Sequence, residues 1–61
     1  MFKVSTTHAN GRLGHVGQRA TLEGAERLCM EWIRVADNYR ITIVTISREG
    51  EIVKAYDTSL Y

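Results

Sequence analysis

The chain has 61 residues, which is enough for one domain spanning 1–61 and too few for a second core. Hydrophobic residues make up 44%, charged residues 25%, and proline is absent, so the composition argues against a disordered tail. The net charge is +1, and the single cysteine excludes an internal disulfide framework. With no signal-peptide-like segment and no apolar run of membrane-spanning length, we expect a cytoplasmic protein without a membrane partner.

The first predicted elements are two strands joined by a tight turn. Residues 2–6 alternate apolar and polar and are rich in β-forming types. Asn10 and Gly11 form a strong hairpin signal because both residue types tolerate positive φ. Residues 13–19 are therefore predicted to return as the second strand.

The register of this hairpin stays open at the level of sequence. A two-residue loop places Leu13 on the face of Val4, and a three-residue loop places Val16 there. Gly14 and Gly17 weaken the second strand and indicate a bulge or a close approach by another part of the chain.

A helix is predicted after Thr21, which is suited to cap its N-terminus. Seven apolar residues then recur at helical spacing: Leu22, Ala25, Leu28, Cys29, Trp32, Ile33 and Ala36. We interpret Cys29 as a buried small hydrophobe and Trp32 as the core anchor. Asn38 is predicted to end the helix in a left-handed conformation.

The last two predicted strands are 39–47 and 51–57, joined by a turn at Gly50. A two-residue turn sets Val53 and Ala55 beside Val44 and Ile46, whereas a three-residue turn sets Ile52, Lys54 and Tyr56 there. The predicted fold class is α+β: a small ββαββ domain with a four-stranded, mainly antiparallel sheet and one helix packed on one face.

One helix covers only one face of a sheet, so the other face is a candidate binding surface. Side chains alternate along a strand, which turns Ile41 and Ile43 one way and Val44 and Ile46 the other. With the helix over Ile41 and Ile43, the opposite face stays uncovered, and exposed apolar area indicates an interaction site. The predicted partner-binding residues are Val44, Ile46, Val53, Arg12 and Arg19.

These features predict a non-enzymatic protein-binding module that uses its open sheet face or a strand edge, with a homodimer as an alternative occupant. No nucleophile with a partner base is present, no cofactor is expected, and two histidines without a third ligand do not make a metal site. The alternative function is nucleic-acid binding by the first hairpin, whose segment 1–20 contains no acid. Its candidate residues are Lys3, His8, Arg12, His15 and Arg19.

The segment Arg19-Ala-Thr-Leu-Glu-Gly-Ala-Glu-Arg-Leu28, followed by Tyr39-Arg-Ile-Thr-Ile43, resembles small phage-encoded proteins that bind and inhibit host enzymes. The same helix entry resembles HicB-like antitoxin domains, although this chain lacks the Pro-Asp-Leu-Pro-Gly strand motif of that family. The resemblance covers about half of the chain. It implies a stand-alone regulator encoded by a phage or mobile element, acting on a host protein in the host cytoplasm, and it transfers no binding residue.

Overall fold

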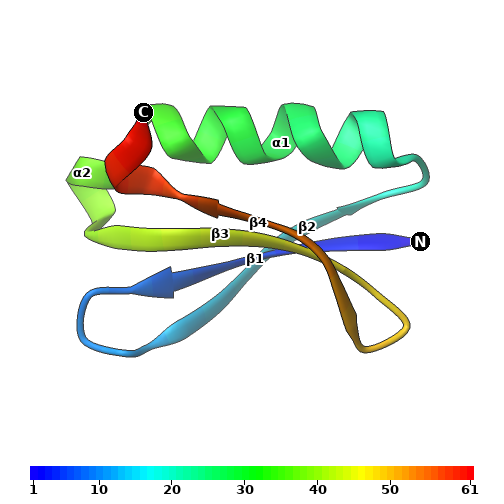
Figure 1. Ribbon diagram of the computed structural model, residues 1–61, viewed down its shortest axis with the longest axis horizontal. Helices are drawn as coiled ribbons and strands as arrows, with labels where there is room; N and C mark the ends of the chain where they lie inside the picture. Colours follow the sequence, from blue (N-terminus) through cyan, green and yellow to red (C-terminus); the bar gives the residue numbers. More distant parts are fainter.

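A computed structural model describes residues 1–61 as a four-stranded antiparallel sheet with one main helix (Figure 1). The elements in chain order are β1 (Phe2–His8), β2 (Leu13–Arg19), α1 (Leu22–Arg34), the short helix α2 (Ala36–Tyr39), β3 (Ile41–Arg48), β4 (Glu51–Asp57) and the 3₁₀ turn η1 (Thr58–Leu60). The strand order is β2-β1-β3-β4, so β1 and β3 are central and β2 and β4 are edges. The predicted ββαββ α+β fold is confirmed. Neither α-helix has the length and apolar content required to cross a lipid bilayer.

Helix α1 begins where the sequence predicts. Thr21 is extended, and its Oγ1 accepts a hydrogen bond from the backbone N–H of Gly24 at 3.1 Å. This bond satisfies one of the N–H groups that a helix start leaves without a partner. The C-terminal prediction is wrong. Because α2 adds a further turn after Val35, the left-handed cap is Arg40 (φ 55°) rather than Asn38.

The first hairpin has the three-residue loop. The N–H of His8 donates to the carbonyl of Arg12 at 2.8 Å, which leaves residues 9–11 in the loop. Val16 is an extra residue in the β1–β2 ladder and packs against the core. Gly17 lies against the helix, because a Cβ there would come within 2.8 Å of Leu28 Cδ2. The predicted bulge and close approach are both present.

The second hairpin combines features of both predicted registers. Its turn has two residues, Glu49 and Gly50, both with positive φ. Val53 is an extra residue in β4, and this bulge shifts the register so that Lys54 lies beside Ile46 and Tyr56 lies beside Val44. The short turn and the side-chain alignment expected for the longer turn therefore occur together.

The predicted orientation of the helix is wrong. Val44 and Ile46 have no exposed surface, whereas Ile43 is 39% exposed on the opposite face. The pairing of β1 with β3 places Ile46 beside Val4 and Val44 beside Thr6, which makes this the more apolar face of the sheet. An irregularity near the start of β3 brings Ile41 into the same core. Helix α1 covers this face with Ala25, Leu28 and Cys29.

Candidate functional site

The sheet face that α1 leaves uncovered is the candidate site, and we call it the open face. The strand registers define its members. The central strands contribute Lys3, Ser5, Thr7, Ile43, Thr45 and Ser47. The edge strands contribute Leu13, His15, Gln18, Ile52, Ala55 and Asp57. The centre of the face is therefore mostly hydroxyl-bearing, while the edges carry large aliphatic side chains.

A hollow of about 450 Å³ lies on this face. Ser5, Thr7 and Thr45 contribute to its lining from the two central strands, and Leu13 and Ile52 contribute from the two edge strands. Figure 1 shows the tips of both hairpins on the side of the sheet away from α1. Leu13 is 76% exposed and Ile52 is 70% exposed. The open face is thus a hollow with a polar centre and an apolar residue on each edge strand.

The predicted partner-binding residues do not form one surface. Val44 and Ile46 are fully buried beneath α1, so they are core residues and do not contact a partner. Val53 is 46% exposed at the bulge of β4. Arg12 precedes β2 and Arg19 ends it, which separates their backbones by roughly 20 Å along the opposite edge of the sheet.

The residues predicted for nucleic-acid binding are also divided. Lys3 and His15 belong to the open face. His8 is directed to the other side, where its Nδ1 donates to the carbonyl of Tyr39 at 2.8 Å. Arg19 Nη1 donates to the carbonyl of the adjacent Gln18 at 2.6 Å. The first hairpin therefore does not present these five side chains as one basic stripe.

Both sheet edges are interrupted. The β2 edge has its bulge at Val16, and the β4 edge has its bulge at Val53. A bulge bends a strand and disturbs the row of free N–H and C=O groups that a partner strand would pair with. Addition of a strand to either edge is therefore less well supported than contact with the open face.

The ionisable groups between α1 and β4 are structural. Lys54 Nζ donates to Glu26 Oε2 at 2.6 Å, and this hydrogen bond raises the pKa of Lys54. Cys29 lies beneath them, and burial raises its thiol pKa from 9.0 to about 11, with Glu26 adding to the shift. A reactive thiol needs a lowered pKa and exposure, so Cys29 is inert at neutral pH. The molecule contains no group of three or more His, Cys, Asp or Glu side chains that could hold a metal ion.

Sequence reasoning did not identify Leu13 and Ile52 as site residues. Each lies near a turn, on an edge strand in which a bulge changes the face that the following residues occupy. A simple alternation therefore assigns these residues unreliably. The sequence did contain one indication of which face is open. Lys3, Ser5 and Thr7 make one face of β1 polar, and that face is the one turned away from the helix.

Comparison of the chain with models of known protein families, with curated proteins and with solved structures finds no match.

Proposed function

We propose that the protein is a non-enzymatic binding module whose open face receives an α-helix of a partner protein. The observation that carries this proposal is the exposure of Leu13 and Ile52, which come from opposite edges of the sheet and line the same hollow. Exposed apolar residues that share one concave surface are typical of interaction sites.

The dimensions of the face favour a helix. Strands β2 and β4 lie three strand spacings apart, which is about 14 Å. An α-helix with its side chains is about 10–12 Å in diameter, so it fits between these edges. Its apolar side chains would contact Leu13, Ile43 and Ile52, while polar side chains would bond to the hydroxyls of Ser5 and Thr45.

The small core of the domain adds support. Only 10 of 61 residues are buried, so a partner that covers the open face would add a substantial fraction of the total buried apolar area. The resemblance of residues 19–28 to phage-encoded regulators suggests a host protein as the class of partner. In that case the protein is an accessory factor that modulates a host enzyme or regulatory protein.

Aspartate substitutions on the open face test the proposal. Leu13→Asp and Ile52→Asp place a charge in the proposed contact, and both positions are exposed enough for the domain to stay folded. Leu60→Asp is the matched control, because Leu60 is 78% exposed on η1, outside the open face. The measurement is affinity capture from bacterial lysate, followed by titration of the captured protein against each purified variant.

The proposal predicts that one captured protein binds the wild type and Leu60→Asp with similar affinity. Its affinity for Leu13→Asp or Ile52→Asp is expected to be lower by at least about tenfold. A loss of this size corresponds to about 1.4 kcal/mol, within the range for a single interface residue. Equal binding by all variants would contradict it. A wild-type dimer in light scattering that Ile52→Asp converts to a monomer would instead assign the open face to a second copy of the chain.

A further inference from the structure

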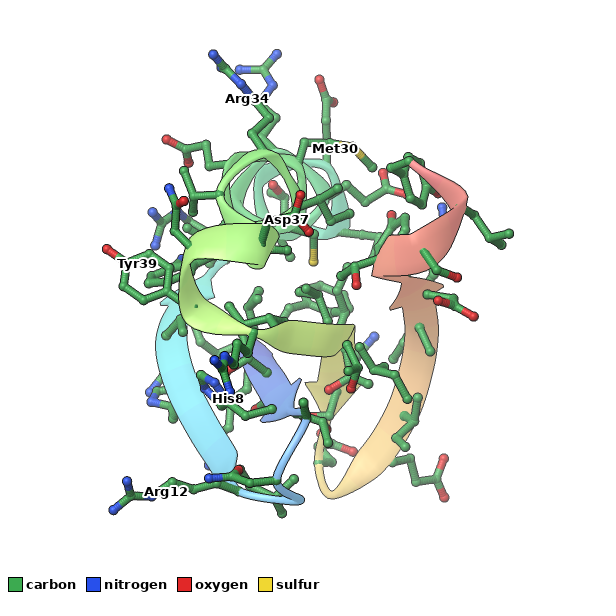
Figure 2. The ribbon with its side chains drawn as sticks, turned by 90° about the vertical axis from the view of Figure 1, so that its left-hand side faces the viewer. His8, Arg12, Met30, Arg34, Asp37 and Tyr39 are labelled. Atoms are coloured by element: carbon green, nitrogen blue, oxygen red, sulfur yellow. The ribbon has the colours of Figure 1, made fainter.

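A second surface lies at the end of the molecule formed by the first turn and α2. Four residues define it, and we call it the aromatic–basic end: His8, Arg12, Tyr39 and Arg40. Figure 2 shows three of them, His8, Arg12 and Tyr39, on the end that faces the viewer. The sequence separates the two pairs by more than 25 positions, so only the fold brings them together.

Backbone hydrogen bonds fix this arrangement. The N–H of His8 donates to the carbonyl of Arg12, and the N–H of Ala9 donates to the carbonyl of Arg40, each at 2.8 Å. His8 Nδ1 also donates to the carbonyl of Tyr39 at 2.8 Å. The backbones of Arg12 and Arg40 therefore lie on either side of the His8–Ala9 segment.

Tyr39 is a supported and accessible aromatic ring. The residue is 54% exposed, so a planar ligand can reach it. Its ring centroid lies 5.6 Å from that of Trp32 with an interplanar angle of 56°, which braces the ring against α1. An exposed ring held in this way provides a stacking surface with little conformational freedom to lose on binding.

Three arginines and two acids lie around this end. The arginines are Arg12, Arg34 and Arg40, and the acids are Asp37 of α2 and Asp57, which ends β4 beside Ile43. Arg12 and Arg40 are both exposed. Arg34 lies near Asp37 at the end of α1, where Figure 2 shows its side chain directed away from the sheet. Neither Arg12 nor Arg40 forms an ion pair with these acids, so both guanidinium groups are free to contact an anionic ligand.

Arg40 occupies a backbone conformation that suits glycine better. Its φ of 55° lies in the left-handed region, which costs a residue with a Cβ about 1–2 kcal/mol. Glycine or asparagine is the usual choice at such a helix C-terminus. Strained backbone of this kind occurs at functional sites, and here the strained residue carries a guanidinium and directly follows the exposed Tyr39 in the chain.

We propose that the aromatic–basic end binds single-stranded nucleic acid. An unpaired base stacks on Tyr39, and Arg12 and Arg40 contact the phosphates on either side of it. Stacking on an aromatic ring between basic residues is the usual way in which proteins hold single strands without reading their sequence. The aromatic–basic end shares no residue with the open face, although Arg12 directly precedes Leu13, so this inference does not depend on the proposed protein partner.

The test uses fluorescein-labelled thymidine and uridine homopolymers of about twelve nucleotides, with fluorescence anisotropy at several salt concentrations. Tyr39→Ala is expected to weaken binding on the order of 5- to 100-fold, whereas Tyr39→Phe retains the ring and the affinity. Tyr61→Ala is the aromatic control, since Tyr61 is 67% exposed on the C-terminal segment.

The charge contribution is tested with Arg40→Gly, which also suits the left-handed backbone. Each lost phosphate contact lowers the slope of log affinity against log salt by about 0.7 for a single strand. We expect this reduction for Arg40→Gly and for Arg12→Ala, and none for Arg27→Ala on the outer face of α1, where Arg27 bonds to Glu23. Thermal unfolding of each variant separates lost binding from lost folding.

Three results would overturn the inference. The first is an absence of binding to either homopolymer at low salt. The second is equal binding by the wild type and Tyr39→Ala when both are folded. The third is competition by thymidine or uridine monophosphate at the same concentration as the homopolymer, which would show a nucleotide site rather than a strand site. Duplex DNA is expected to bind more weakly than the single strand, because its bases are not free to stack on Tyr39.

Discussion

Cys29 is a buried helix residue whose ionisation makes the stability of the fold depend on pH. The residue has no exposed surface and faces the sheet from α1. Its pKa of about 11 reflects the loss of solvation that a thiolate would suffer there, and the nearby Glu26 opposes ionisation further. The sequence predicted burial of this side chain from helical spacing alone. The contact of its neighbour Glu26 with Lys54 was not predicted, because that contact depends on the bulge in β4.

The raised pKa of Cys29 predicts a loss of stability at alkaline pH. The unfolded thiol ionises at 9.0 and the folded thiol at about 11, so the folded state holds its proton more tightly. The contribution to the free energy of unfolding is complete below pH 9 and falls as the pH rises to about 11. Urea unfolding below pH 9 and between pH 9 and about 11 should show a larger fall in the free energy of unfolding for the wild type than for Cys29→Ala. Tyrosine and lysine titrate in both proteins, so equal losses would contradict the assignment to Cys29.

At the scale of single elements, the helix was easier to predict than the strands. Thr21 and the apolar spacing of residues 22–36 are local signals, and α1 begins at the predicted residue. The strands were placed to within two residues, since the predicted strands 2–6 and 39–47 are 2–8 and 41–48 in the structure. Val16 and Val53, however, each interrupt the alternation on which face assignments depend. The stability of a bulge depends on the pairing of two strands and on the side chains that pack over them. The sequence of one strand determines neither.

The N-terminal cap of α1 gives a prediction at this scale. Thr21→Ala removes the oxygen that accepts from the N–H of Gly24 and should lower the free energy of unfolding by about 1 kcal/mol. Thr21→Ser keeps the acceptor and should retain most of that stability. Chemical denaturation of the three proteins measures both effects. Similar losses for serine and alanine would mean that the methyl group of Thr21, and not its hydroxyl, stabilises the helix start.

For the molecule as a whole, the helix could not be assigned to one face of the sheet from the β3–β4 hairpin alone. Both faces of β3 carry isoleucine, so the pattern within that strand is ambiguous. The decision comes from β1, whose Val4 and Thr6 pair with Ile46 and Val44 while Lys3, Ser5 and Thr7 mark the other side. The pairing of β1 with β3 joins residues about 40 positions apart, and the orientation follows from it. Because this pairing buries Val44 and Ile46, the candidate site is the opposite face, which contains Leu13 and Ile52.

Two isoleucines on opposite faces of the sheet test this orientation directly. Ile46 has no exposed surface, and Ile52 is 70% exposed. A domain of this size is stabilised by roughly 3–9 kcal/mol. An aspartate at 46 removes a buried aliphatic side chain and also buries a charge, at a cost of more than about 4 kcal/mol, so Ile46→Asp should be largely unfolded. Ile52→Asp should keep the native circular dichroism spectrum and dispersed amide resonances. A folded Ile46→Asp variant would mean that α1 covers the other face, and the open face would then consist of different residues.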